Sequence, residues 1–519
     1  MMAWRKIRIA LAALAIGFLP LSAVDAAGPF SLDTVVKTDA GYVSGIGGQV
    51  RSYKGIPFAA PPVGPLRYAP PQPVKPWDTI RSAKTFSATC QVAEDCLTLN
   101  VWTPAQKANA KLPVLVWIHG GGFVIGSSAQ PGYDGSVLAN QGIVVVSMNY
   151  RLGPYGFMAH PELSKENGGV SGNQGMLDMV QGLKWVKANV AAFGGDPNNV
   201  TIWGESAGGA AISLLLVMPS SEGLFQKAMV DSPWHIYAPI THLNKTWYGR
   251  KSGEAMGAAR GALASLRAAP FDPRSFNLGG AINDVNTGAA AYPVVDGVVI
   301  PDDPARLFEL GKFHHVPIMI GGNADDGSIA GARVANLAEA KTLVAGRLGP
   351  ASEKILAMYG GVDDASAPAA TRKLAGDALF AIAQSHIAQA GARAGLPVYS
   401  YEFARVSPLN KRQNQGATHA ADLGYFFGNL PDGAGGGGAR ITDFDTADQR
   451  VSSEMMGALV AFVKTGSPNG KGLPAWPKYT LADEKYLEWN DQTTVKAHMR
   501  DDRLKAMWAD LEPRVAANR

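Results

Sequence analysis

The stretch Val200–Val217, VTIWGESAGGAAISLLLV, decides the fold class of this 519-residue chain. Its first four residues are mostly apolar and β-branched and predict a buried strand, and the run from Ala210 to Val217 is compatible with a helix. The pattern Gly-x-Ser-x-Gly lies between them. In this context it is typical of a sharp turn that strains the serine backbone and exposes the hydroxyl. We therefore interpret Ser206 as a nucleophile.

Besides the strand-like segment 398–403, three more apolar runs, at 112–118, 143–148 and 316–320, predict further buried strands. Their hydrophobicity is continuous, which indicates strands covered on both faces. Helical patterns such as 174–189 lie between them. The sequence therefore predicts an α/β fold with a large, mostly parallel central sheet and helices on both faces. No repeat or sharp boundary divides the core, so we expect one domain over residues 27–519, with helical insertions.

A glycine-rich segment, HGGGF at 119–123, follows the predicted strand 112–118. Loops of this kind donate backbone N–H groups to an oxyanion, and glycine is needed because side chains would block the approach. We predict Gly121, Gly122 and Ala207 as the three donors.

A serine hydroxyl needs a histidine base and a carboxylate that orients it, and in this fold the chain order is serine, acid, histidine. His419 is our candidate base, because it lies in a loop beyond the strand 398–403. His386 lies inside a helical pattern and is interpreted as structural. The pair His314 and His315 lacks a second cluster of metal ligands with suitable spacing, so we predict no metal.

Two neighbouring carboxylates, Asp325 and Asp326, are candidates for the acid. They follow the strand 316–320 through a short loop. Parallel sheets carry functional groups at the carboxyl ends of their strands. Periodicity does not choose between the two aspartates.

The first 26 residues have the pattern of a secretory signal peptide. Arg5, Lys6 and Arg8 precede an apolar run, 9–21, that is too short to span a bilayer, and small residues follow. We expect export to the periplasm or the medium, with no stable membrane insertion after cleavage. Cys90 and Cys96, the chain's two cysteines, are then a candidate disulfide.

The composition bounds the class of protein. Hydrophobic residues make up 46% and charged residues 17%, which indicates a globular protein with a large core and excludes disorder and a charged coiled coil. The formal net charge is +4, and close to +2 without the first 26 residues. So small an excess implies no nucleic-acid partner. No cofactor is required, and the oligomeric state is not predicted.

Several motifs give the chain a family resemblance. They include YKGIPFAAPPVGPLR at 53–67, EDCLTLNVWTP at 94–104, NYRLGPYGF at 149–157 and the long stretch 172–209 that ends in GESAGG. With these motifs the chain resembles the type-B carboxylesterases, the carboxylesterase and cholinesterase family of α/β hydrolases. It is most similar to their bacterial para-nitrobenzyl-esterase-like branch.

The resemblance implies the α/β-hydrolase fold and a serine carboxylesterase that works through an acyl-enzyme on small-molecule esters. It implies Ser206 as nucleophile, His419 as base and Asp326 as acid, since Asp326-Gly327-Ser328 stands where the family usually has Glu-Gly-Ser. Ser232 resembles the family serine that hydrogen-bonds the acid. Its neighbours Asp231 and Pro233 depart from the usual Gln and Gly.

The short segment between the two cysteines argues against choline esters as substrates. In cholinesterases a long disulfide loop carries an aromatic residue that stacks on choline, whereas Cys90 and Cys96 enclose only 91–95. Choline specificity is therefore not expected. A specialised detoxifying esterase, a carbamate or lactone hydrolase, and a non-catalytic binding protein of the same family remain as alternatives.

Overall fold

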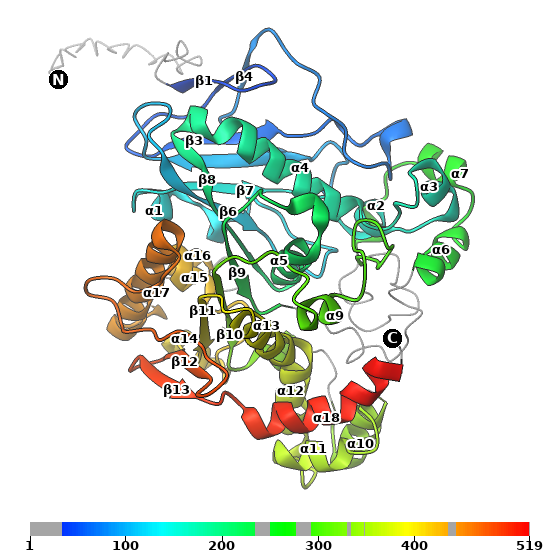
Figure 1. The fold of residues 1–519 in the computed structure, drawn as a ribbon, viewed down its shortest axis with the longest axis vertical. Helices are drawn as coiled ribbons and strands as arrows, with labels where there is room; N and C mark the ends of the chain where they lie inside the picture. The colour runs from blue at the N-terminus through cyan, green and yellow to red at the C-terminus, as the bar shows by residue number, and fades with distance from the viewer. Residues whose placement is uncertain are drawn as a thin grey trace, which may run out of the picture.

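The computed structural model describes residues 34–233, 250–276, 292–329, 334–346, 348–433 and 443–517. Within them a ten-stranded sheet runs through the centre, in the order β13-β12-β11-β10-β9-β8-β6-β7-β5-β3 (Figure 1). A small sheet of β1 (Val35–Lys37), β2 (Tyr42–Ser44) and β4 (Ile80–Ser82) lies near the start of the described chain. Residues 1–26, the expected signal peptide, lie outside the described residues.

The middle of the large sheet is parallel and its edges are antiparallel. The parallel strands, in spatial order, are β7 (Val144–Met148), β6 (Leu112–Ile118), β8 (Gly195–Glu205), β9 (Lys227–Asp231), β10 (Ile318–Asn323), β11 (Val398–Phe403) and β12 (Lys485–Trp489). The antiparallel edge strands are β5 (Thr98–Thr103) and β3 (Arg51–Pro57) on one side and β13 (Thr494–Ala497) on the other. The predicted mostly parallel α/β sheet is confirmed.

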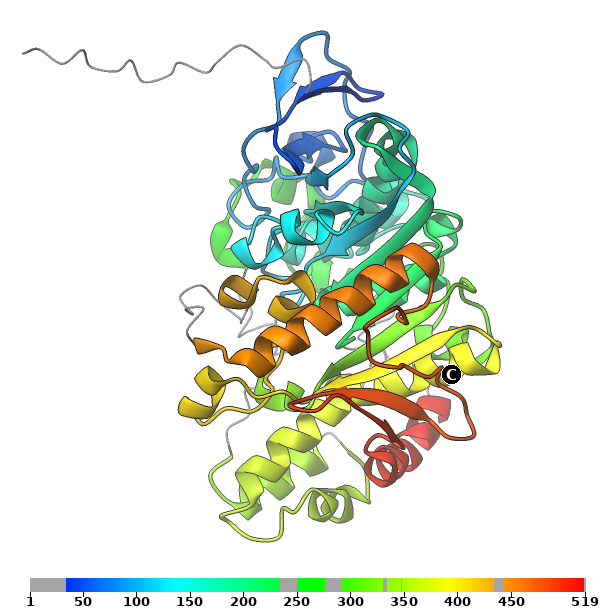
Figure 2. The same cartoon turned by 90° about the vertical axis from the view of Figure 1, so that its left-hand side faces the viewer.

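Helices cover both faces of this sheet. Successive residues of a strand point to opposite faces, so Val116 of β6 packs in one hydrophobic cluster and Trp117 in the other. The first cluster includes α4 (Gln174–Asn189), α5 (Ala207–Val217) and α13 (Ile382–Arg393). The second includes α15 (Leu423–Phe427) and α17 (Thr446–Thr465), the long helix that crosses the sheet in orange in Figure 2.

The remaining described helices are shorter or peripheral, and α10, α11, α12 and α18 pack together at one end of the molecule (Figure 1). Their bounds are α1 (Ser136–Ala139), α2 (Gly153–Phe157), α3 (Pro161–Glu166), α6 (Arg250–Ala258), α7 (Leu263–Ala268), α9 (Pro304–Glu309), α10 (Leu337–Ala345), α11 (Ser352–Met358), α12 (Ala367–Gly376), α14 (Pro408–Arg412), α16 (Leu430–Gly433) and α18 (Asp501–Ala517). None of the helices in the described part of the chain is long and apolar enough to cross a membrane.

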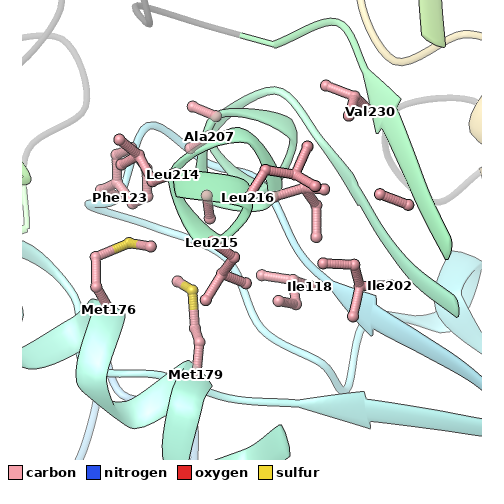
Figure 3. Close-up of a cluster of buried hydrophobic side chains, with 14 of the residues drawn as sticks. Ile118, Phe123, Met176, Met179, Ile202, Ala207, Leu214, Leu215, Leu216 and Val230 are labelled. Atoms are coloured by element: carbon pink, nitrogen blue, oxygen red, sulfur yellow. The ribbon is translucent and has the colours of Figure 1, made fainter. Parts of the chain in front are cut away.

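Helix α5, which follows Ser206, is buried along its whole length. Figure 3 shows its leucines packed between Met176 and Met179 of α4 and the strand residues Ile118, Ile202 and Val230. Because interiors pack at crystal-like density, a helix enclosed in this way has no room to shift. The packing of α5 therefore fixes the position of the turn that carries Ser206.

The predicted elements match the structure closely where the sequence pattern is strong. The bounds of β6, β11 and α4 coincide with the predicted segments 112–118, 398–403 and 174–189. Helix α5 begins at Ala207, three residues before the expected run, because its glycines are helical here. Strand β10 begins at Ile318 and continues to Asn323. Glycine is needed at 321 in this strand because a Cβ there would lie 2.3 Å from the ring of Tyr401.

Candidate active site

The three predicted catalytic side chains follow three strands of the parallel sheet. Ser206 follows β8, Asp326 follows β10, and His419 lies in the segment after β11. The carboxyl ends of parallel strands meet at the same edge of a sheet, so the topology brings these positions together although they span more than 200 residues.

Ser206 occupies a strained turn. Its backbone φ of 58° and ψ of −121° lie outside the regions that side-chain-bearing residues usually adopt. The turn requires glycine nearby, because a Cβ at Gly208 would lie 2.2 Å from the carbonyl oxygen of Ile118. The N–H of Ser206 donates to the carbonyl oxygen of Asp231 at 3.1 Å, which ties the turn to the end of β9.

Asp326 uses both of its carboxylate oxygens. Oδ1 accepts a hydrogen bond from Nδ1 of His419 at 2.8 Å. Oδ2 accepts one from the hydroxyl of Ser232 and one from the N–H of Asn323, each at 3.0 Å. The carboxylate is buried, so these donors replace the water it has lost. Ser232 therefore makes the contact that the family resemblance implied.

Asp325 points elsewhere. Its carboxylate lies 3.2 Å from Nε of Arg372, a half-exposed side chain. Its backbone pairs with Thr418, and its N–H donates to the carbonyl oxygen of Ala417 at 2.9 Å. Of the two aspartates between which periodicity did not choose, Asp326, the one that the family resemblance implied, is in contact with His419. The backbone of Asp325 supports the loop that carries this histidine.

His419 is held on three sides. Its Nδ1 is bonded to Asp326, and its N–H donates to the hydroxyl of Ser328 at 3.0 Å. The ring of Phe380 packs against the imidazole with ring centres 4.7 Å apart. An imidazole fixed in this way keeps Nε2 aimed in one direction, as a general base requires.

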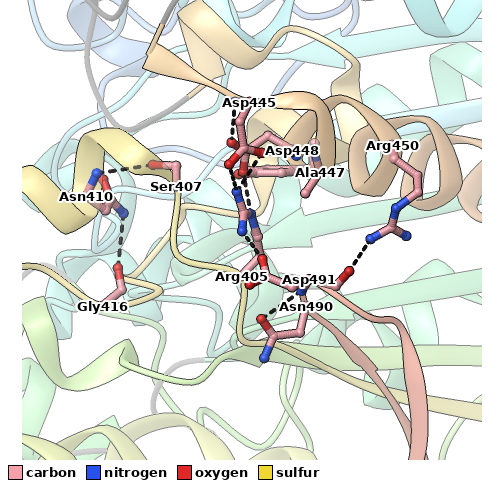
Figure 4. Close-up of polar contacts among 11 residues, drawn as sticks. Arg405, Ser407, Asn410, Gly416, Asp445, Ala447, Asp448, Arg450, Asn490 and Asp491 are labelled. Atoms are coloured by element: carbon pink, nitrogen blue, oxygen red, sulfur yellow. Dashed lines mark hydrogen bonds and ion pairs between the residues drawn. The ribbon is translucent and has the colours of Figure 1, made fainter.

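The segment between β11 and His419 is anchored by Arg405, which is 2% exposed. Its guanidinium pairs with Asp448 at 2.6 Å, with Asp445 at 2.7 Å and with Asp491, so it joins this segment to α17 and to the end of β12 (Figure 4). A planar guanidinium with several donors suits such a junction. The ion cluster sets where the histidine loop begins.

The glycine-rich loop lies against Ser206. A Cβ at Gly120 would stand 3.0 Å from Cβ of Ser206 and 2.7 Å from the carbonyl oxygen of Glu205. Gly121 and Gly122 have φ of 107° and 63°, which glycine adopts without strain. Within the described residues no acceptor is bonded to their N–H groups. Ala207 is the first residue of α5, so its N–H has no intrahelical partner.

The predicted disulfide between Cys90 and Cys96 is present, and it supports this loop. The side-chain oxygen of Gln91, inside the closed ring, accepts a hydrogen bond from the N–H of Gly126 at 3.1 Å. Gly126 in turn packs so closely on His119 that a Cβ there would lie 2.5 Å from Nδ1 of that histidine. The short disulfide ring therefore braces the far end of the glycine-rich loop.

Glu205 is a site residue that sequence reasoning passed over, although it stands inside the decisive motif. Its Oε1 lies 3.0 Å from Nε2 of His419, in a charge contact that lacks hydrogen-bond geometry. Burial raises the pKa of Glu205 to about 7, against the opposing effect of His419. The signal was a carboxylate at the end of the buried half of β8, two residues after the mostly apolar run Val200–Trp203.

The imidazole of His419 responds to both carboxylates. Burial lowers its pKa, while the charge of Glu205 and the hydrogen bond and charge of Asp326 raise it, with a net result of about 9. The site therefore stabilises an imidazolium strongly, which is the form the base takes when it has accepted a proton.

A possible metal cluster lies outside this site. In the described part of the chain Glu484, His498 and Asp501 could offer ligand atoms within 4.8 Å of one another. They are partly or fully exposed, and Lys505 already pairs with Asp501 at 2.6 Å. His314 instead bonds Ser221 and a backbone carbonyl.

Comparisons with known proteins agree on one family. The model of the carboxylesterase family matches residues 32–507. The chain is 36% identical over 464 residues to a fumonisin B1 esterase of Sphingopyxis macrogoltabida, with 86% of this chain and 85% of that protein covered. It is 33% identical over 494 residues to the para-nitrobenzyl esterase of Bacillus subtilis (strain 168), with 89% and 96% covered.

Solved structures show the same likeness. A structure of a PNB esterase matches with a TM-score of 0.78 at 30% identity and covers 92% of this chain and 99% of its own. A carboxylesterase of Geobacillus stearothermophilus matches with a TM-score of 0.76 at 32% identity and covers 91% of this chain and 100% of its own. The predicted α/β-hydrolase fold and the resemblance to this family are thereby confirmed.

Proposed function

The chain belongs to the carboxylesterase family and is a carboxylic ester hydrolase, and we propose that it works through Ser206, His419 and Asp326. One observation carries the proposal: the 2.8 Å bond from Nδ1 of His419 to Asp326 fixes the tautomer whose Nε2 accepts a proton. Nε2 makes no hydrogen bond with a described residue, so once the imidazole is neutral its lone pair is available to accept the proton of the Ser206 hydroxyl.

In the acylation step, the hydroxyl oxygen of Ser206 attacks the ester carbonyl carbon while its proton passes to Nε2 of His419. The carbonyl oxygen becomes an oxyanion, and the N–H groups of Gly121, Gly122 and Ala207 stabilise it. The carbon–oxygen bond to the alcohol then breaks. The imidazolium gives its proton to the departing alcohol, which leaves an acyl group on Ser206.

Deacylation repeats these steps with water. The neutral imidazole of His419 takes a proton from a water molecule, and the hydroxide attacks the acyl carbon. The same three N–H groups hold the second oxyanion. When that intermediate collapses, the proton returns to Ser206 and the carboxylic acid leaves. Asp326 and Glu205 stabilise the imidazolium in both halves of the reaction, since each is in contact with one ring nitrogen.

Hydrolysis of a chain-length series tests this proposal. Purified protein is assayed with p-nitrophenyl acetate, butyrate, octanoate and laurate, with Ser206→Ala in parallel. We expect turnover by the wild type and a loss of about a thousandfold or more in the variant. No turnover by folded wild type, together with no labelling by a fluorophosphonate, would favour the non-catalytic binding protein instead.

We also propose that residues 1–26 are a signal peptide and that the mature chain, 27–519, forms one catalytic domain. A disulfide persists in oxidising compartments, and the bond between Cys90 and Cys96 supports export. The N-terminal sequence of the protein recovered from the periplasm or medium tests this, with Ala27 as the expected first residue. A mature protein that begins at Met1 would contradict it.

A further inference from the structure

Two buried carboxyl groups lie close to the catalytic residues, and neither takes part in the proposed acylation or deacylation. Asp231 is the last residue of β9, and Asp422 precedes α15; both are 0% exposed. Their side chains are within hydrogen-bonding reach of each other. The sequence analysis marked Asp231 only as a departure from the Gln that is usual beside Ser232.

The surroundings of this pair offer it no positive counter-charge. In the described part of the chain neither carboxyl forms an ion pair with a lysine or arginine. The charged groups that act on the pair include Glu205, Asp326 and His419. Each of the two nitrogens of His419 is already next to Asp326 or Glu205. Two ionised carboxylates in contact in such a place are too costly to persist, so a proton must neutralise one.

The hydrogen bonds around the pair also require that one of the two aspartates carries a proton. Asp422 accepts bonds from Nδ2 of Asn323 at 3.1 Å and from the hydroxyl of Tyr401 at 3.3 Å. The hydroxyl of Tyr401 also lies within hydrogen-bonding reach of Asp231, but it has only one proton, and in this structure it donates that proton to Asp422. Both carboxylate oxygens of Asp231 therefore lack a donor among the described residues, and a buried oxygen without one is costly. A carboxyl proton between the two aspartates supplies that donor.

The pair connects the elements that carry the catalytic groups. The carbonyl oxygen of Asp231 accepts from the N–H of Ser206 at 3.1 Å, and the next residue, Ser232, bonds Asp326. Asp422 lies three residues after His419, in the same turn of chain. A bond between the two aspartates thus joins the end of β9, which holds Ser206, to the loop that holds His419.

We propose that Asp231 and Asp422 share one proton and that the neutralised pair positions Ser206 and His419 for reaction. The inference rests on the proposed function and adds two positioning residues to it. Burial raises the pKa of Asp231 well above its usual range and that of Asp422 to about 6, each with help from neighbouring carboxylates. When the proton leaves at high pH, two adjacent negative charges repel, and the histidine loop is pushed away from Ser206.

Asparagine at position 231 tests the shared proton, because its amide donates a hydrogen bond to Asp422 at every pH. In the wild type we expect kcat/KM to rise as His419 becomes neutral and, at still higher pH, to fall by about tenfold per pH unit as the pair loses its proton. In Asp231→Asn this fall is expected to vanish or to move up by at least about one pH unit. Asp422→Asn gives a second variant with the same expectation. Asp302→Asn, a half-exposed carboxylate paired with Arg306, is the matched control that keeps the wild-type profile.

Infrared spectroscopy detects the shared carboxyl proton directly, and the measurement needs no substrate. The wild type is expected to show the carbonyl band of a protonated carboxylic acid at neutral pH that disappears on alkaline titration. This band should be absent or reduced in Asp231→Asn and unchanged in Asp302→Asn. An active wild type without such a band, or a folded Asp231→Asn variant with an unchanged alkaline limb, overturns the inference. A folded wild type that shows the band and hydrolyses no ester overturns the proposed function instead.

Discussion

Nε2 of His419 lies 3.0 Å from Oε1 of Glu205, the residue next to Ser206 in the chain. The same nitrogen is the one that we propose receives the serine proton. A carboxylate in this place stabilises the imidazolium, which favours proton transfer in the transition state. It also keeps the resting base protonated over a wider pH range, so the base is available only at higher pH.

This relationship predicts the pH dependence of the enzyme and of Glu205→Gln. His419 must be neutral to accept a proton, and its pKa of about 9 places the rise of kcat/KM on the alkaline side. Gln keeps the size and removes the charge that raises this pKa. We expect the rising limb to move to lower pH by about one unit or more.

The measurement is a pH profile of kcat/KM on p-nitrophenyl acetate for both proteins. Glu222→Gln, at an exposed turn outside the site, is the matched control and should keep the wild-type midpoint. A midpoint in Glu205→Gln equal to or above that of the wild type would show that Glu205 does not set the pKa of the base.

The two neighbouring aspartates should behave differently when each is changed to asparagine. Asp326→Asn removes the acceptor of the His419 Nδ1 proton, and we expect kcat to fall about a thousandfold or more. Asp325→Asn removes one partner of a half-exposed pair with Arg372 and should leave kcat close to the wild type. Steady-state kinetics of the two variants check this. The reverse order of effects would move the catalytic acid by one residue.

Lengthening the acid should also impair the enzyme, although the family usually has glutamate there. Both oxygens of Asp326 are engaged, and Oδ2 already stands 2.8 Å from where a Cβ of Gly322 would be. An added methylene would shift the carboxylate by more than 1 Å, so we expect Asp326→Glu to lose about a hundredfold in kcat with the fold intact. Kinetics together with a thermal unfolding curve separate the two effects. Wild-type kcat in this variant would mean that the loop adapts freely.

Replacing Arg405, the buried arginine that anchors the histidine loop, should lower the stability of the fold strongly. Arg405→Met would leave Asp448, which is 0% exposed, without its counter-charge, and we expect the free energy of unfolding to fall by about 3 to 5 kcal/mol. Arg412→Met removes a more exposed pair with Asp443 and should cost less than about 1 kcal/mol. Denaturant unfolding of both variants gives the comparison. Equal losses would show that the Arg405 cluster does not hold the fold.

Much of this fold and site could be predicted from local sequence. The bounds of β6 follow from an apolar run, because burial on both faces of a sheet demands continuous hydrophobicity. Those of α4 follow from helical periodicity, and those of β11 coincide with the strand-like segment 398–403. The position of Ser206 follows from flanking glycines that only a sharp turn between strand and helix requires. The disulfide follows from there being two cysteines in a chain predicted to be exported.

Periodicity left Asp325 and Asp326 open, and only the family resemblance implied Asp326. The charge contact of Glu205 and the pair of Asp231 and Asp422 depended on tertiary structure. Neighbouring residues in a turn point in different directions, and periodicity is silent about which direction faces a histidine some 90 residues away in the chain. A carboxylate's pKa depends on burial and on charges brought near by folding. The sequence by itself therefore determined which chemistry the chain carries, whereas the packing of β8, β9, β10 and β11 side by side decided which carboxylates meet the histidine.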